Sequence, residues 1–321
     1  MTRSVLTVAT GKKVYVDMAV NLARSFLRWH RESDILFCLA TDQPEVVPAD
    51  VRSRVRILDV GHLKHITGFS IKLYLDELAA TPHTLFIDAD CLVYGRLEPV
   101  FERFKGRAVS AIGDTLQEGA FFCDVHEIIR KMSLSYLPRF VGGIYYLEKN
   151  EISRRVFEYA RTLLPQYDNL GLVRLRGKEN EEPLLAIAMA TFGETPIEED
   201  GSIKADRMFY TYYAANVLIG KARLWNNDNS YPANAYFRIS ESRPIIVHYN
   251  SNFAENFEYY AECKRLYLSV VYKLPNRLIN FISKVRYELP GKSVGSLKDI
   301  ARPYYRALFG IRSIKESNRS D

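Results

Sequence analysis

Residues 84–90 read Thr84-Leu85-Phe86-Ile87-Asp88-Ala89-Asp90, an apolar stretch that ends in two carboxylates. The run predicts a buried strand over Thr84–Ile87. Because residues i and i+2 of a strand point to the same face, Asp88 and Asp90 are expected to approach one ion. Hard oxygen ligands of this kind suit Mg²⁺ or Mn²⁺. The alternative is a solvated pair of aspartates in a turn, since Asp-x-Asp also occurs by chance.

The residues before this stretch alternate between strand and helix patterns. The expected elements are a strand at Ser4–Ala9, a helix around Val16–Leu27, strands at Asp34–Ala40 and Val55–Leu58, and a helix at Ser70–Ala79. This order predicts a largely parallel sheet whose ligand site lies at the carboxyl ends of its strands.

The second half is less regular. The expected elements are a strand at Gly143–Leu147, a helix at Glu151–Leu164 capped by Asn150, a helix at Glu181–Ala190 with Pro183 in its first turn, and a strand at Ile245–His248. The economical interpretation is one α/β domain over residues 1–260, with helices on both faces of a single mixed sheet, followed by a basic helical extension over residues 261–321.

A third metal ligand is predicted at the end of the last strand. His248 follows the apolar run Ile245-Ile246-Val247, and a neutral imidazole can complete a site begun by two carboxylates. A structural hydrogen-bonding histidine is the alternative. Gly142-Gly143 is expected to let the backbone approach a ligand closely, the alternative being a bend at a strand start.

Composition excludes several classes of protein. Hydrophobic residues make up 47% and charged residues 26% of the 321, as in ordinary globular proteins. The four cysteines form no C-x-x-C pair, so neither a zinc ribbon nor a redox motif is indicated, and Cys38 is expected to be a buried free thiol. The N-terminal apolar stretch is too short for a signal peptide and no uncharged run is long enough for a membrane span, so we expect a cytoplasmic protein.

The net charge of +6 belongs to the C-terminal part of the chain. From Lys264 onward there are 13 Lys and Arg against 4 Asp and Glu, so the body is slightly acidic. This distribution argues against a nucleic-acid footprint over the main domain.

The segment after about Pro290 is typical of an amphipathic helix on an anionic membrane surface. Apolar residues recur at helical spacing, with basic residues between or beyond them: Leu297, Ile300, Ala301, Tyr304, Tyr305 and Leu308, and Lys298, Arg302, Arg306 and Arg312. The alternative is a helix that covers the body, and Pro303 argues against one continuous helix. A second apolar stripe is expected to pack mostly in the core: Tyr267, Val270, Val271, Leu274, Leu278, Phe281, Ile282 and Val285.

The order of these segments resembles the GT-A-fold glycosyltransferases, in particular the family that includes glycogenin and bacterial lipopolysaccharide galactosyltransferases. Leu85–Asp90 is similar to its Y-L-D-x-D metal motif, and Phe140–Leu147 to its N-x-G strand beside the donor sugar. Glu181-Glu182-Pro183 stands where the family has Asp-Gln or Asp-Glu, and His248 where it has the third metal ligand. The resemblance covers roughly residues 4–255.

The resemblance implies a nucleotide-sugar donor, with UDP-sugars favoured, and a glycan or lipid-linked acceptor. It implies that Val8, Ala9 and Thr10 hold the nucleobase and ribose, and that Lys72 faces the nucleotide. The donor site would further include Asp88, Ala89, Asp90, Gly142 and Gly143.

Two departures from the family pattern stand out. The family continues from its histidine through Gly to Lys-Pro-Trp, and that Lys binds the pyrophosphate, whereas this chain reads His248-Tyr249-Asn250-Ser251-Asn252-Phe253. The Asn of N-x-G is Val141 here.

Chemically, the set suits the departure of a nucleoside diphosphate. A divalent cation, Mn²⁺ or Mg²⁺, and a cationic side chain such as Lys72 stabilise the negative charge that grows on the leaving group. Glu181 and Glu182 are the candidate carboxylates beside an oxocarbenium-like sugar, in a retaining or an inverting enzyme. Their alternative is a pair of acids favoured at a helix N-terminus. Competing functions are a nucleotidyltransferase on a similar sheet and a non-catalytic sugar-nucleotide-binding protein.

Overall fold

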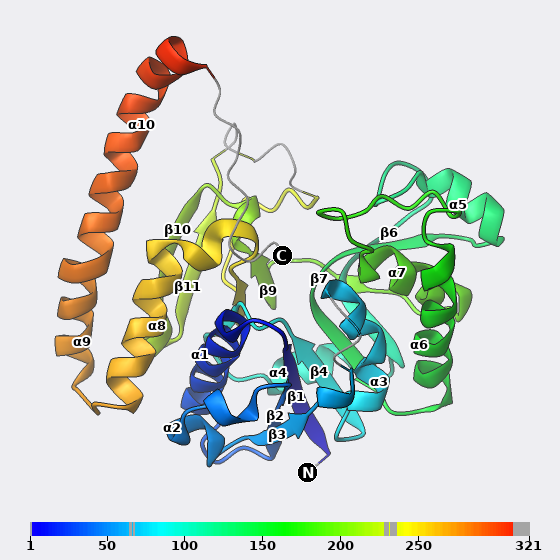
Figure 1. Cartoon of the computed structure of the whole chain (residues 1–321), viewed down its shortest axis with the longest axis horizontal. Helices are drawn as coiled ribbons and strands as arrows, with labels where there is room; N and C mark the ends of the chain where they lie inside the picture. Colours follow the sequence, from blue (N-terminus) through cyan, green and yellow to red (C-terminus); the bar gives the residue numbers. More distant parts are fainter. Residues whose placement is uncertain (1, 64–65, 67, 228–230, 232–235, 311–321) are drawn as a thin grey trace.

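The computed structural model describes residues 2–63, 66, 68–227, 231 and 236–310. Its centre is a seven-stranded sheet in the order β3-β2-β1-β4-β7-β6-β8 (Figure 1). The strands are β1 (Arg3–Ala9), β2 (Ile35–Thr41), β3 (Arg56–Asp59), β4 (His83–Ile87), β6 (Val109–Leu116), β7 (Leu137–Glu148) and β8 (Ile197–Glu198). Strands β1 to β4 run parallel, while β7 is antiparallel to both β4 and β6, so the sheet is mixed as expected.

Helices cover both faces of this sheet because alternate residues of each strand point to opposite sides. Val5 of β1 belongs to the core beneath α1 (Lys13–Trp29), α4 (Glu98–Phe104) and α8 (Phe257–Val270). The next residue, Leu6, belongs to the core beneath α3 (Leu75–Leu78), α5 (Val125–Met132), α6 (Glu151–Leu163) and α7 (Glu181–Thr191). A short helix, α2 (Ala49–Arg52), precedes β3. The predicted α/β fold class is confirmed.

Two three-stranded sheets, which the sequence patterns did not predict, lie beside the main one. One has the order β5-β13-β9, from Cys91–Val93, Ile246–His248 and Lys204–Asp206. The other has the order β10-β11-β12, from Tyr212–Asn216, Lys221–Trp225 and Glu241–Ser242. The first of these sheets carries His248 to the site.

Three local expectations are wrong. The segment expected as a helix at Ser70–Ala79 is a 3₁₀ helix, η3 (Gly68–Tyr74), followed by the single turn of α3, because ion pairs of Lys72 hold this segment against the sheet. Gly142-Gly143 lies inside β7 and not at its start. Asp88 and Asp90 occupy the turn between β4 and β5, so the turn, and not strand alternation, brings them together.

The C-terminal part forms α8, α9 (Asn276–Ser283), a π-helical segment η8 (Lys284–Glu288) and α10 (Leu289–Phe309). Helix α10 runs through Pro303, contrary to expectation, since a helix can accommodate a proline by kinking at the ring. No described helix combines the length and apolar character needed to cross a bilayer. Arg312 of the predicted basic set lies outside the described residues.

The expectation that this stripe packs in the core is wrong: none of its eight members is buried, four being partly exposed and four exposed. Val271, Leu278, Phe281 and Val285 are 40–65% exposed. The reason is that α9 packs through a different face, on which Ile279 and Ser283 are fully buried.

Candidate functional site

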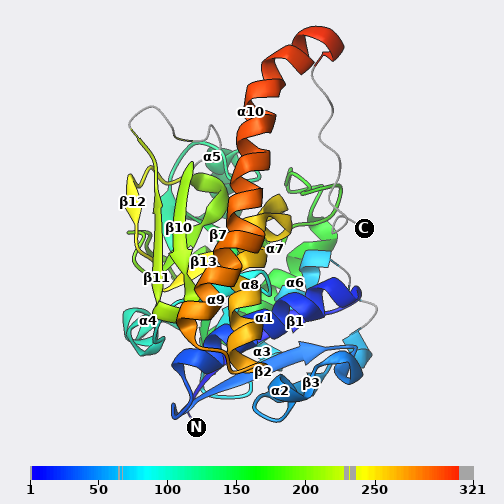
Figure 2. The ribbon, with the colours of Figure 1, turned by 90° about the vertical axis from the view of Figure 1, so that its left-hand side faces the viewer.

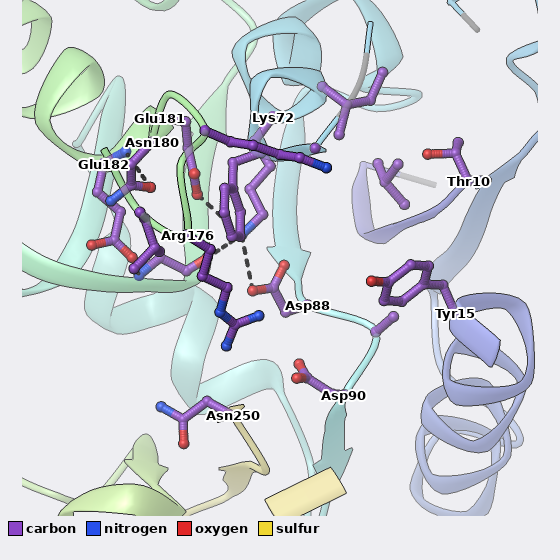
Figure 3. Close-up of a pocket in the computed structure, with 18 of the residues that line it drawn as sticks. Thr10, Tyr15, Lys72, Asp88, Asp90, Arg176, Asn180, Glu181, Glu182 and Asn250 are labelled. Atoms are coloured by element: carbon purple, nitrogen blue, oxygen red, sulfur yellow. Dashed lines mark hydrogen bonds and ion pairs between the residues drawn. The ribbon is translucent and has the colours of Figure 1, made fainter. Parts of the chain in front are cut away.

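A cavity of about 1030 Å³ opens at the carboxyl ends of β1 and β4 (Figure 3). Its wall comes from the end of β1, the start of α1, η3, the Asp88–Asp90 turn, β7, the start of α7 and the loop after β13. This is the edge of a parallel α/β sheet at which ligands are expected. Its size suits a ligand as large as a nucleotide sugar.

The Asp88–Asp90 turn is fixed by its backbone. The Asp88 amide donates to the Gly143 carbonyl at 2.9 Å, and the Tyr249 amide donates to the Asp90 carbonyl at 3.0 Å. The turn is thereby tied to β7 on one side and to the end of β13 on the other. Asp90 is buried and Asp88 is partly exposed to the cavity.

His248 is held between two carboxylates. Its Nδ1 lies 2.7 Å from Oδ1 of Asp206, and its Nε2 lies 3.1 Å from Oδ1 of Asp90 and 3.8 Å from Oδ2 of Asp88. Burial opposes the charged imidazolium, but Asp90 and Asp206 outweigh it and raise the pKa of His248 to about 10. The Asp206 contact fixes the ring so that Nε2 faces the two aspartates of the turn.

These residues fit a divalent cation. A carboxylate that accepts from Nδ1 leaves Nε2 free to coordinate, which is the usual support for a metal-bound histidine. Asp90, Cys91 and His248 place one potential ligand atom each within 4.8 Å of the others. Cys91 is the weakest of the three, because burial, with the nearby aspartates, raises the pKa of its thiol well above the usual range and Mg²⁺ and Mn²⁺ prefer oxygen and nitrogen. Asp88 borders the cluster.

Lys72 connects the Asp88–Asp90 turn with the start of α7. Its Nζ lies 2.9 Å from Oδ2 of Asp88 and 3.0 Å from Oε1 of Glu181, and it donates to the Gly142 carbonyl at 2.9 Å (Figure 3). Burial opposes its charge, but the two carboxylates raise the pKa of Lys72 above its ordinary value. It therefore remains a cation inside the cavity.

Glu181 and Glu182 open α7, which is capped by the side chain of Asn180. Glu182 accepts from the Gly142 amide at 2.7 Å. Burial and the charge of Glu181 raise the pKa of Glu182 to about 8. Two buried polar atoms, Nδ2 of Asn180 and Oε2 of Glu181, have no hydrogen-bond partner among the described residues. Both residues line the cavity, although these two atoms are themselves buried.

Most of the residues predicted from the sequence meet at this cavity. Those that line it are Val8, Thr10, Lys72, Asp88, Ala89, Asp90, Gly142, Glu181, Glu182 and His248. Two do not. Ala9 points into the core beneath α1, and Gly143 lies behind His248, where an added Cβ would come within 2.5 Å of Nδ1. Gly143 thus makes room for the imidazole and not for a ligand.

Several residues of the site carried no clear signal in the sequence. Asp206 lies 42 positions before His248, and only the pairing of β9 with β13 brings the two together. Lys12 is half-buried and lines the cavity. Arg176 reaches it from a loop that the sequence patterns left unassigned, and its guanidinium points toward Asp88 and Asp90 (Figure 3).

No protein-family profile matches the chain, and no curated protein matches it by sequence. Its fold is that of the GT-A glycosyltransferases, as the motifs predicted. Mouse xyloside xylosyltransferase 1 in its apo form matches with a TM-score of 0.50 at 12% identity over 79% of this chain and 99% of that one. The bifunctional glycosyltransferase WbbM matches with a TM-score of 0.49 at 12% identity, over 78% of this chain and 46% of that one. The galactosyltransferase LgtC, solved with donor and acceptor sugar analogues, matches with a TM-score of 0.45 at 16% identity over 75% and 86%. At these identities the likeness shows the fold alone.

Gly143→Ala is expected to displace His248 and to weaken divalent-metal binding by at least about tenfold, the scale seen when the support of a metal ligand is lost. Calorimetric titration with Mn²⁺ measures this. Gly95→Ala is the control, because an added Cβ there meets only the Ile245 side chain at 3.8 Å. Equal Mn²⁺ affinity of Gly143→Ala and the wild type would show that His248 does not depend on this glycine.

Proposed function

We propose that the chain is a metal-dependent glycosyltransferase that moves a sugar from a nucleotide-sugar donor to a glycan or lipid-linked acceptor. One observation carries the proposal: the Asp88–Asp90–His248 cluster, Lys72 and the two glutamates of α7 border the same cavity on a GT-A-type sheet. UDP-sugars are the donors favoured by the motif resemblance.

Asp88, Asp90 and His248 would hold Mn²⁺ or Mg²⁺. Such an ion neutralises the charge that develops on a diphosphate leaving group. Lys72 adds a second, permanent positive charge on the same side of the cavity. Asn180 and Glu181, which line the cavity beside Lys72, are proposed to face the donor sugar.

In the reaction, the bond between the anomeric carbon and the diphosphate oxygen breaks, and the acceptor oxygen bonds to that carbon. The acceptor hydroxyl must lose its proton. Glu182 is the proposed catalytic residue, because a carboxyl group with a pKa of about 8 can exchange protons near neutral pH. Glu181, paired with Lys72, is proposed to support the sugar as a fixed carboxylate.

Asp90→Ala, or removal of metal by EDTA, is expected to abolish metal-dependent nucleotide binding and turnover, since either change empties the proposed centre. The measurement is product release from a panel of nucleotide sugars, with and without an acceptor extract. Release of nucleoside diphosphate fits a glycosyltransferase, and binding without release fits a sensor. A nucleotidyltransferase would instead release pyrophosphate from a nucleoside triphosphate and a sugar 1-phosphate, which are assayed in parallel. Metal-dependent nucleotide binding by Asp90→Ala would contradict the proposed ligand set.

Glu182→Gln is expected to lower kcat by roughly 10²-fold or more while donor affinity stays near wild type. The reason is that Gln resembles the protonated carboxyl group in shape and polarity but exchanges no proton. Donor hydrolysis rates and donor Kd values measure the two quantities. A loss of affinity with kcat preserved would make Glu182 a binding residue.

The same variant has a stability signature. An acid whose pKa is raised from 4.5 in the unfolded chain to about 8 in the folded one loses its proton first from the unfolded chain. Its contribution to the free energy of unfolding is therefore present below about pH 4.5 and is lost as the pH rises through 8. The Tm of the wild type should fall relative to that of Glu182→Gln between these limits, whereas the exposed control Glu151→Gln should show no such relative change.

Arg176 is proposed to replace the pyrophosphate-binding Lys that is missing after His248. Among the described residues it has no hydrogen-bond or ion-pair partner, whereas Lys72 is engaged by two carboxylates. Its loop is held in place by Arg174, which pairs with Asp168 and Glu179. An unpaired guanidinium that points toward the metal-binding aspartates is suited to a diphosphate.

Arg176→Ala is expected to weaken binding of a nucleoside diphosphate by about tenfold or more and that of the matching monophosphate by much less, because a charged hydrogen bond is lost only at the second phosphate. Calorimetry with UDP and UMP in Mn²⁺ measures this. Lys178→Ala, on the same loop and also lining the cavity, is the matched control. Equal losses for UDP and UMP would assign Arg176 to another part of the ligand.

The extension after about Pro290 is proposed to bring the enzyme to an anionic membrane surface. Support comes from α10, on which Leu297, Ile300, Tyr304 and Leu308 are 65–76% exposed. A lipid-linked acceptor would suit this placement. The assignment of residues 261–321 as a separate extension remains a prediction.

A further inference from the structure

Helices α9, η8 and α10 follow one another without a break over residues 276–309 and project beyond the body (Figure 2). The first part of this long helix packs on the body. Ile279 and Ser283 are buried, Arg265 of α8 contacts Asn280 and Glu288, and an added Cβ at Gly291 would collide with Phe257 of α8. These contacts define an inner face that ends near Gly291.

The face opposite these contacts is apolar and exposed. Leu278, Phe281 and Val285 are spaced by three and four residues, as on one side of an α-helix. All three are at least 45% exposed, although they lie on the part of the helix that packs on the body. Clustered exposed apolar side chains of this kind mark a surface that contacts something.

The distal half repeats the pattern. Leu297, Ile300, Tyr304 and Leu308 are spaced by three, four and four residues. In an uninterrupted α-helix the nineteen residues from Leu278 to Leu297 would rotate this second stripe by about 100° from the first.

The π-helical segment η8 corrects this offset. A π turn takes up about one residue more than an α turn, so the nineteen residues complete about five whole turns. The two stripes therefore fall on the same side. Leu289, which follows η8 directly and is 49% exposed, lies between them on that side.

The distribution of charged residues along this helix indicates which kind of partner the surface suits. Residues 276–309 contain seven Lys and Arg against two acidic residues, and Glu288 is already paired with Arg265. Arg277 and Lys284 flank the first stripe, while Lys298, Arg302 and Arg306 lie beside and opposite the second. An apolar face with Tyr at one end and a basic polar face is the pattern of a helix that lies in an anionic membrane interface.

We propose that the π segment joins α9 and α10 into one continuous membrane-binding surface that begins at Leu278, on the body itself. This inference rests on the proposed membrane attachment of the tail and extends it to the body. The same helix would hold the body against the lipid, so the tail would not act as a separate anchor. A helix fixed to α8 by its inner face would also fix the orientation of the enzyme on the membrane.

The test uses the full chain and co-sedimentation with vesicles of phosphatidylcholine alone or with a quarter phosphatidylserine, at low and high salt. Wild type should bind the anionic vesicles, less so at high salt. Phe281→Glu and Ile300→Glu should each lower the bound-to-free ratio by about tenfold or more, because either places a charge in the apolar stripe that is proposed to lie in the membrane. Ile152→Glu changes an exposed apolar residue on α6, away from this helix; it is the control and should bind like wild type.

The rotational alignment of the two stripes is tested directly by insertions after Ser293, beyond the contacts with α8. Two alanines rotate the distal stripe by about 200° and four by about 40°. Two should lower binding as strongly as Ile300→Glu, and four should largely preserve it. Unchanged Tm and an unchanged far-UV circular dichroism spectrum confirm that each variant is folded, and neither measurement depends on the catalytic proposal.

Binding lost by Ile300→Glu but kept by Phe281→Glu would leave the tail as the anchor and overturn the continuous surface. Equal binding of the two-residue and four-residue insertions would overturn the role of the π segment. Binding to neither vesicle, together with a dimer in sedimentation equilibrium that Phe281→Glu dissociates, would make the stripe an interface between copies of this chain.

Discussion

The contact between Asp206 and His248 is the constraint on which the site depends. The register of the small sheet places His248 opposite both Asp206 of β9 and Cys91 of β5, so three short strands bring the imidazole between its supporting carboxylate and the Asp88–Asp90 turn. The main sheet contributes the space, because Gly143 of β7 leaves room for the ring and its carbonyl accepts from the Asp88 amide. The small sheet, the turn and the main sheet thus meet at His248, which the Asp206 contact holds in place.

Acidic and basic groups are concentrated around this contact. Asp88, Asp90, Asp206, Glu181 and Glu182 face Lys72, Lys204 and His248, and the two lysines are already held by carboxylates. Buried charges are tolerated only when they are compensated. Burial and the charge of Glu181 raise the pKa of Glu182, while Asp90 and Asp206 raise the pKa of His248 against the effect of its burial. Both groups therefore keep protons that a bound cation would make unnecessary.

The long C-terminal helix has two faces with different roles. Through the Ile279 face it completes the packing of α8, and through the Leu278 face it exposes an apolar surface that a globular domain would normally bury. Both faces belong to the same helix, so the packing of one face against α8 fixes the position of the other. The site and this surface are thereby held in a fixed relation without a flexible linker.

The sequence by itself determined the mixed α/β architecture, the position of the two aspartates after a buried strand, His248 at the end of another, and the glutamates at the start of α7, because periodicity and capping are local properties of the chain. It also indicated the basic amphipathic C-terminus. Only the tertiary structure decided that Asp206 supports His248, that Arg176 enters the cavity, that Gly143 serves the imidazole, and that Phe281 faces outward. The physical reason is that strand pairing between segments distant in sequence, and the phase shift of a single π turn, leave no mark in the local pattern of apolar and polar residues.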